Sequence, residues 1–160
     1  MRIGRRAWTF DPATARATLD WGRGVWPYRT SWIWATGWSR GRDRAIGLNL
    51  GRLGGDEGPD AAQAENCVFA GGRLHKIGAV DVVHDLGAPL RPWRFRARDG
   101  RLDVLFTPRF ALARRVELLV VASRLHQLLG SFTGSAVTEE GERLSLDGLY
   151  GWAEDHRARW

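Results

Sequence analysis

Residues 93–106 run Trp93-Arg-Phe-Arg-Ala-Arg-Asp-Gly-Arg-Leu-Asp-Val-Leu-Phe106, and this stretch decides the fold class. Before the central Asp99-Gly100 dipeptide, apolar residues alternate with arginine, and after it apolar residues again recur at every second position. A period of two is typical of a strand with one buried face, and Asp-Gly is a common hairpin turn. The stretch therefore predicts an antiparallel β-hairpin.

Turn signals on both sides of this hairpin extend the pattern. Gly71-Gly72 and Glu140-Gly141 also separate segments that alternate in polarity. Regular turns of this kind predict an all-β antiparallel meander that forms a barrel or sandwich. Residues 111–129 fit either a helix or strands; their β-branched centre favours strands over about 113–122 and 124–137. A short helix near 149–157, or an irregular tail, is expected to complete the chain.

Length and composition limit the class of protein. The chain has 160 residues, enough for one domain, so we expect a single β domain over 1–160. Its one cysteine, Cys67, excludes a disulfide framework and a thiolate metal site. Because no apolar run approaches the ~20 residues of a membrane helix, we expect no membrane span and a cytoplasmic location.

The basic charge does not select a partner. The net charge is +6, and Lys76 is the only lysine. The basic blocks 1–52 and 91–124 alternate with the acidic blocks 53–90 and 125–160, which favours internal neutralisation. We therefore expect no nucleic-acid partner.

An aromatic ladder is the most unusual feature of the sequence. Within residues 25–38 every aromatic side chain has an even number, and the members are Trp26, Tyr28, Trp32, Trp34 and Trp38. Side chains at a period of two share one face of a strand. This face either fills the core, as large indole side chains usually do, or lines a ligand cavity. The large number of indole N–H groups that need partners is the argument for the cavity.

Standard catalytic motifs are missing. Residues 130–134 resemble a nucleophile elbow, but Phe132 stands where serine is required. The four histidines lack metal-binding spacing, so we expect no metal and no cofactor. Three polar pairs remain as site candidates beside the ladder: Glu65-Asn66, His75-Lys76 and His126-Gln127. Adjacent residues on a strand point to opposite faces, so only one member of each pair can face a common cavity.

Several ordered blocks make the whole chain resemble the domain of unknown function 2804 family of bacterial proteins. They include Leu19-Asp-Trp-Gly-Arg-Gly-Val-Trp-Pro-Tyr-Arg-Thr-Ser-Trp32, Ile46-Gly-Leu-Asn-Leu-Gly51, Arg73-Leu-His-Lys76, His126-Gln-Leu-Leu-Gly-Ser-Phe-Thr-Gly134 and Gly151-Trp-Ala-Glu154. The resemblance implies a lipocalin-like antiparallel barrel or sandwich. It also implies that the chain corresponds to the carboxyl-terminal half of a larger two-part β protein, or to a short form of it.

The resemblance assigns no reaction, so two functions are weighed. The first is binding of a hydrophobic or amphipathic small molecule in a Trp-lined cavity, with an arginine or Lys76 at its mouth. The expected ligand-binding residues are Trp26, Tyr28, Arg29, Trp32, Trp34, Trp38, Asn66, Lys76 and Gln127.

The alternative function is a hydratase, isomerase or cyclase that acts on a hydrophobic substrate by general acid/base chemistry. Its candidate catalytic residues are Glu65, His126 and His75. The sequence leaves open whether the protein is an enzyme. Beyond the small molecule, the expected partners are an upstream β domain or further copies of the chain, because an incomplete barrel exposes strand edges.

Overall fold

The structure is a computed structural model that describes residues 1–11, 15–25, 27–39, 45–53 and 65–160. Within these ranges the chain is all-β and contains no helix, so none could span a membrane. The strands are β1 (Arg2–Ile3), β2 (Arg6–Ala7), β3 (Arg29–Trp38), β4 (Ile46–Leu53), β5 (Cys67–Ala70), β6 (Arg73–Lys76), β7 (Val80–Val83), β8 (Trp93–Ala97), β9 (Leu102–Glu117), β10 (Ala122–Val137), β11 (Arg143–Ser145) and β12 (Leu149–Arg159).

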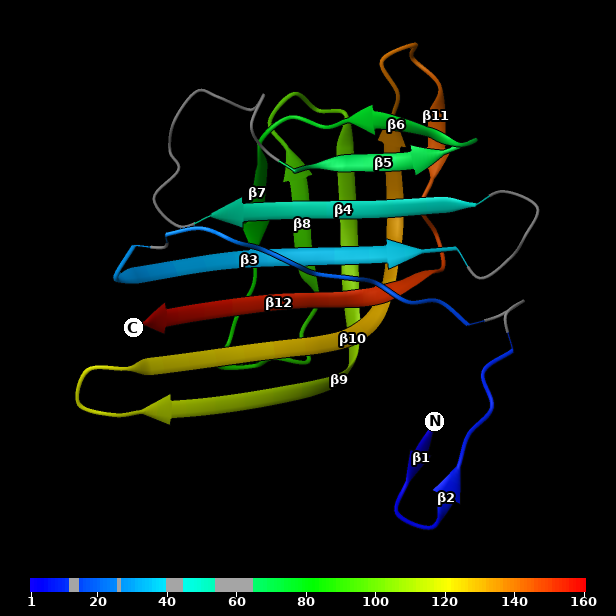
Figure 1. The fold of residues 1–160 in the computed structure, drawn as a ribbon. Coiled ribbons are helices and arrows are strands. Elements are labelled where there is room, and N and C mark those ends of the chain that lie inside the picture. The colour runs from blue at the N-terminus through cyan, green and yellow to red at the C-terminus, as the bar shows by residue number, and fades with distance from the viewer. Residues whose placement is uncertain (12–14, 26, 40–44, 54–64) are drawn as a thin grey trace.

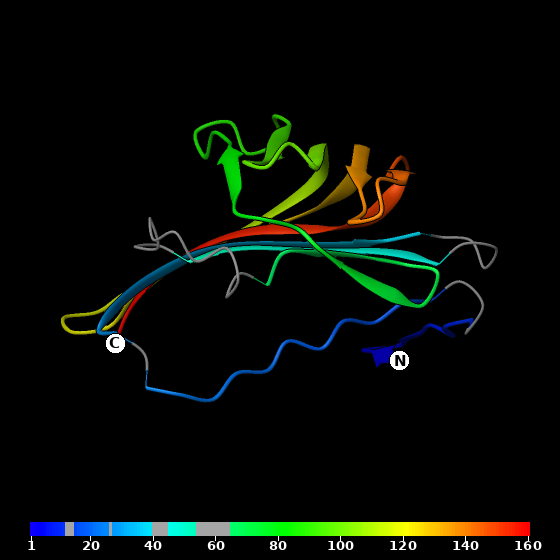
Figure 2. The ribbon, with the colours of Figure 1, turned by 90° about the horizontal axis from the view of Figure 1, so that it is seen from above.

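One antiparallel sheet forms the body of the protein. Its strand order is β6-β5-β4-β3-β12-β10-β9-β8-β7, with β11 paired to β10 (Figure 1). The sheet curls into a half-barrel, so that β7, β8 and β11 lie over one side of the layer formed by β3, β4 and β12 (Figure 2). The hairpin of β1 and β2 forms a separate two-stranded sheet. The predicted all-β antiparallel fold is confirmed.

The hairpin predicted from residues 93–106 forms as expected. β8 pairs with β9 in the register Trp93↔Phe106 to Arg96↔Asp103. Trp93, Phe95 and Phe106 are at most 1% exposed, whereas the alternate arginines lie outside. Asp103 accepts hydrogen bonds from Arg94 and Arg96, and Asp81 accepts them from Arg98. Each of these arginines is therefore paired with an acidic side chain on a neighbouring strand.

Two sequence-based expectations need correction. Of residues 111–129, the flanks 111–117 and 122–129 are strand, as expected, but the hairpin turn falls at 118–121, so that β9 ends at Glu117 and β10 begins at Ala122. The expected helix or irregular tail at 149–157 is wrong, because these residues belong to β12, the central strand between β3 and β10. Helix-forming residues are common in this segment, but long-range pairing on both edges overrides their local preference.

The core lies between the curled half and the flatter layer. Its largest fully buried side chains are Trp93, Phe95, Phe106 and Phe132, packed with leucines from β4, β9, β10 and β12. Phe132 contacts both Phe95 and Phe106, with ring centroids 6.5 Å and 4.8 Å away. The aromatic rings of three strands thus form the centre of the core.

A row of glycines lets these rings lie directly on the backbone. Gly130, Gly151 and Gly37 are cross-strand neighbours on β10, β12 and β3. A Cβ on Gly151 would lie 1.9 Å from the backbone oxygen of Thr36, and one on Gly130 would lie 2.3 Å from that of Thr107. The register of β9 and β10 also shifts at Gly130, where these 16-residue strands pass from one layer into the other. Glycine is therefore required where the sheet bends.

Candidate functional site

The ladder tryptophans lie on the face of the sheet opposite the core. On β3, Ala35 is fully buried in the core and Gly37 lies under the Phe132 ring, so the even-numbered residues point to the other side. Cross-strand pairing extends this side onto β12, β10 and β4. We call this surface the Trp face; its members are Trp32, Trp34, Trp38, Asn49, Gln127, Tyr150, Trp152, Glu154 and His156.

Aromatic rings of β3 and β12 interlock across the Trp face. Trp152 stacks edge-on with Trp34 and with Trp38, at centroid distances of 5.4 Å and 5.6 Å. Trp38 also contacts Tyr150 at 6.5 Å. All four side chains remain partly exposed. Edge-to-face stacks of this kind hold aromatic rings in fixed positions, so the face is a preformed apolar surface.

A recessed carboxylate interrupts this apolar surface. Glu154 is 8% exposed, and its two oxygens accept hydrogen bonds from Trp32 Nε1 at 2.9 Å and from Gln127 Nε2 at 3.0 Å. Asn49 is the acceptor for the neighbouring indole: Trp34 Nε1 donates a hydrogen bond of 2.9 Å to Asn49 Oδ1. Each carboxylate oxygen still has acceptor capacity after one hydrogen bond. Glu154 can therefore accept a further donor from a molecule lying on the face.

His156 completes the polar part of the face. Its ring contacts Trp32 at a centroid distance of 4.3 Å, and its Nδ1 lies 3.9 Å from Glu154 Oε1. Its Nε2 forms a hydrogen bond of 2.9 Å with Ser123 Oγ. Burial lowers the pKa of His156, against the opposing pull of the Glu154 and Asp155 carboxylates. The neutral imidazole is thus favoured beside a carboxylate, an arrangement suited to proton transfer.

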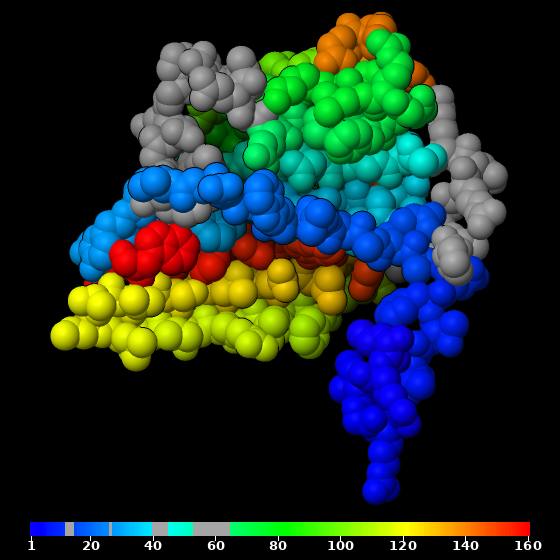
Figure 3. All heavy atoms as spheres, in the orientation of Figure 1, coloured from blue at the N-terminus to red at the C-terminus, as the bar shows by residue number. Residues whose placement is uncertain are grey.

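The segment before β3 crosses the Trp side of the sheet. Figures 1 and 2 show it running in front of β3, away from the curled half that covers the core, and Figure 3 shows its atoms over this face. Its apolar side chains do not pack there: Leu19, Trp21 and Val25 are 89%, 76% and 102% exposed. The segment therefore crosses this side without burying these apolar side chains against the sheet.

Comparison with protein-family models identifies the family of this chain. The family described as a domain of unknown function (DUF2804) matches residues 1–160. The chain belongs to the DUF2804 family. No curated protein and no solved structure matches it. The DUF2804 match covers the Trp face, the glycine row and the segment before β3, and it confirms the resemblance seen in the sequence blocks.

The first two catalytic candidates of this DUF2804 chain do not meet. Glu65 lies just before β5, and His126 lies on β10, four strands further along the sheet. At the usual spacing of about 4.8 Å per strand, roughly 19 Å separates the two positions. His126 also points to the core side, in a row with Asp155 and Ile33. These two residues therefore form no acid/base pair, and the nearest carboxylate–imidazole pair on the Trp face is Glu154 with His156.

Of the expected ligand-binding residues, only some lie together. Trp32, Trp34, Trp38 and Gln127 belong to the Trp face, whereas Trp26 lies outside the described residues. Asn66 is 1% exposed and holds backbone groups, accepting from the Gly51 N–H and donating to the Gly78 carbonyl. Tyr28, which is 54% exposed, donates its hydroxyl proton to the Val120 carbonyl. Arg29 lies on the opposite side of the sheet from the Trp face.

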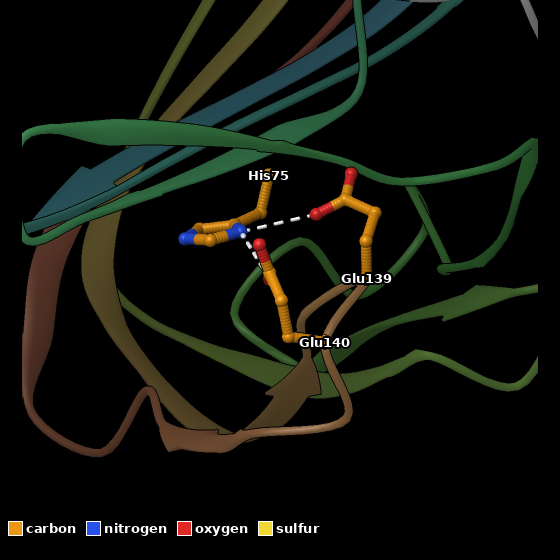
Figure 4. Close-up of side chains that lie close together, drawn as sticks. All are labelled: His75, Glu139 and Glu140. Carbon is orange, nitrogen blue, oxygen red and sulfur yellow. Dashed lines mark hydrogen bonds and ion pairs between the residues drawn. The ribbon is translucent and has the colours of Figure 1, made fainter.

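His75, the third catalytic candidate, belongs to a separate cluster. Its Nδ1 lies 3.0 Å from Glu139 Oε2 and 3.6 Å from Glu140 Oε2 (Figure 4), and the three donors could hold a metal ion. The remaining oxygens are already used: Glu140 pairs with Arg73 at 2.7 Å, and Glu139 accepts from the Lys76 backbone N–H.

The charges of this cluster explain its role. Hydrogen bonds from their own backbone N–H groups lower the pKa of both Glu139 and Glu140, and contacts with His75 and Arg73, respectively, lower them further. Both carboxylates are thus stabilised as anions by groups of the chain itself. The cluster acts as an ion-pair network that fastens β6 to the turn after β10.

Sequence reasoning missed half of the site. Tyr150, Trp152, Glu154 and His156 show the same even-numbered period as the ladder, and this signal was present in the sequence. A helix or irregular tail over 149–157, as expected from the sequence, would not place these four side chains on one face. In the structure these residues provide the carboxylate, the imidazole and two of the aromatic rings of the Trp face.

Proposed function

We propose that the protein binds a hydrophobic or amphipathic small molecule and that the Trp face receives it. The observation that carries the proposal is a preformed aromatic surface with a recessed hydrogen-bonded carboxylate, Glu154, near its middle. Ligand sites are typically apolar surfaces with a few fixed polar groups that orient the ligand.

Apolar side chains on the neighbouring strands widen the surface. In the row that contains Trp152, the pairing continues to Leu129 on β10 and Phe110 on β9, which are 37% and 56% exposed. On the other side, the row of Trp38 continues through Gly47 to Phe69, which is 44% exposed. Exposed apolar side chains grouped along these rows support an interaction site on this side of the sheet.

The polar groups indicate the ligand chemistry. Glu154 accepts hydrogen bonds and has none to donate when ionised. We therefore expect the bound molecule to carry a hydroxyl or another N–H or O–H donor on an apolar skeleton. The ligand would lie between the Trp face and the segment before β3, where it would also cover Leu19, Trp21 and Val25.

The experiment is a titration of tryptophan fluorescence with fatty alcohols, fatty acids and isoprenoid alcohols. Wild-type protein should show a saturable change with at least one class. Trp152→Phe removes one indole from the centre of the face and should weaken binding about tenfold, the effect of losing part of an anchoring aromatic contact. Trp8→Phe removes one indole outside the main sheet and should leave the affinity unchanged. Equal effects of the two variants, or no saturable change with any ligand, would refute the proposal.

The Glu154–His156 pair supports one alternative, a hydratase, isomerase or cyclase activity on the same ligand. A neutral imidazole 3.9 Å from a carboxylate could pass a proton to or from a bound molecule. The test is product formation from unsaturated isoprenoid alcohols, followed by mass spectrometry. Turnover by wild-type protein that His156→Gln abolishes, with unchanged ligand affinity, would support catalysis; binding without turnover supports the binding function alone.

A further inference from the structure

The end of the sheet beyond the core carries an unusual cluster of positive charge. Four strands, β9, β10, β12 and β3, continue here without cover from β7 and β8 (Figure 2). The side that faced the core now faces outwards and carries five arginines, which we call the arginine shelf: Arg29, Arg115, Arg124, Arg157 and Arg159.

The strand register places these arginines directly beside one another. Arg124 of β10 pairs with Arg115 on one side and with Arg157 on the other, and Arg159 pairs with Arg29. Like charges in directly opposed positions destabilise a sheet. Such a cluster is unfavourable unless an anion offsets the repulsion.

The carboxylates near the shelf offset only part of this charge. Glu117 binds Arg115 and lies 3.3 Å from Arg124, and Asp155 lies 3.6 Å from Arg157 while its other oxygen binds His84. Among the described residues, Arg29 has no carboxylate partner. Within the part of the chain that the structure describes, five guanidinium groups thus face two carboxylates.

The shelf also contains a hollow. It has a volume of about 400 Å³, and four of the five shelf arginines line it together with Ser31 and Glu117. Arg159 is held in place there, because its Nη2 donates to the Leu118 and Leu119 carbonyls at 3.3 Å and 3.4 Å. Its buried Nε has no hydrogen-bond partner among the described residues. The hollow is thus lined by a guanidinium that backbone carbonyls hold in place.

From this charge, spacing and hollow we infer that the arginine shelf is a binding site for a phosphate-bearing anion. Guanidinium groups donate pairs of N–H bonds to phosphate oxygens, and adjacent strands set such groups about 4.8 Å apart. A diphosphate spans two neighbouring arginines at this spacing. The shelf lies on the side of the sheet opposite the Trp face, so this site is independent of the proposed function.

The test is calorimetric titration of the full chain with inorganic pyrophosphate at low salt. Wild-type protein should bind saturably, and Arg157→Gln and Arg29→Gln should each weaken binding by about fivefold. Arg143→Gln, an exposed arginine of β11 that lies away from the shelf, is the matched control and should bind as wild type does.

A stability measurement separates this role from a structural one. Because Arg29 faces Arg159, Arg29→Gln should keep or raise the melting temperature while it weakens pyrophosphate binding. No binding by wild-type protein, equal weakening in Arg143→Gln, or a lower melting temperature in Arg29→Gln would overturn the inference.

A second arm identifies the source of the phosphate. Phosphatidylcholine vesicles that contain phosphatidic acid are sedimented with wild-type protein and with Arg157→Gln, and vesicles of phosphatidylcholine alone are the control. If wild-type protein sediments with the vesicles that contain phosphatidic acid and Arg157→Gln does not, the ligand of the shelf is a lipid headgroup. If wild-type protein binds pyrophosphate but does not sediment with these vesicles, the ligand is a soluble phosphorylated molecule.

Discussion

Replacing Gly151 by alanine should destabilise the protein strongly, because β12 and β3 approach each other too closely for any side chain there. The new Cβ would lie 1.9 Å from the Thr36 oxygen, and ordinary contact begins at 3.4 Å, so the strands would have to separate by about 1.5 Å. Separation of this size breaks the hydrogen bonds on either side of the contact. Two lost bonds at about 1 kcal/mol each, plus loosened packing, amount to a loss of about 3 kcal/mol.

Urea unfolding followed by circular dichroism measures this loss, and a thermal melt should show a decrease of about 6–12 °C for a chain of this size. Gly51→Ala is the matched control, since Gly51 is also in a strand of the same sheet and a Cβ there meets nothing within 4 Å. Its stability should stay within about 0.5 kcal/mol of wild type or increase slightly. If both variants unfold at the wild-type midpoint, the close approach of β12 and β3 at the glycine row is wrong.

Three further predictions concern the core and the Trp face. Phe132→Ala removes the ring at the centre of the core and should lower the free energy of unfolding by about 3–5 kcal/mol in a urea titration. Leu119→Ala, at a 95% exposed position, should change this free energy by less than about 0.5 kcal/mol. Glu154→Ala should cost about 1–3 kcal/mol because it leaves the Trp32 and Gln127 donors unpaired, and Glu154→Gln, which keeps an acceptor oxygen, should cost less; an equal loss in both variants would exclude the hydrogen bonds as the cause. Folding lowers the pKa of His156, so near and below pH 6.5 the unfolded state binds more protons than the folded state. The melting temperature of wild-type protein should therefore decrease as the pH falls through 6.5. His156→Gln should make the melting temperature less dependent on pH in the same series of melts.

The sequence predicted the fold class because the decisive signals are local. The alternation of residues 93–106 and the Asp99-Gly100 turn lie within a single hairpin, so its two strands and their buried faces follow from neighbouring residues alone. β12 was missed because its neighbours are not local: it pairs with β3, more than a hundred residues earlier in the chain. Residues 149–157 also lack a consistent apolar alternation, since Asp155 lies on the core side of the strand.

The candidate site was predicted in part for a related reason. The period of two correctly grouped Trp32, Trp34 and Trp38, but a period cannot tell which side of a strand faces the core. Here the small residues between the tryptophans determine which side of β3 faces the core, because Ala35 and Gly37 allow the Phe132 ring to lie against the strand. The larger indoles are thereby left on the opposite side of the sheet, where they meet β12.

The most direct test of ligand binding at the Trp face is a nuclear magnetic resonance titration that observes the indole N–H signals. The nine tryptophans give separate probes on and away from the face. Addition of an isoprenoid alcohol or fatty alcohol that binds should shift the signals of Trp32, Trp34, Trp38 and Trp152. It should leave in place the signals of the buried Trp93 and of Trp8, which lies outside the main sheet. Shifts confined to Trp93, or spread equally over all nine indoles, would contradict binding at the Trp face.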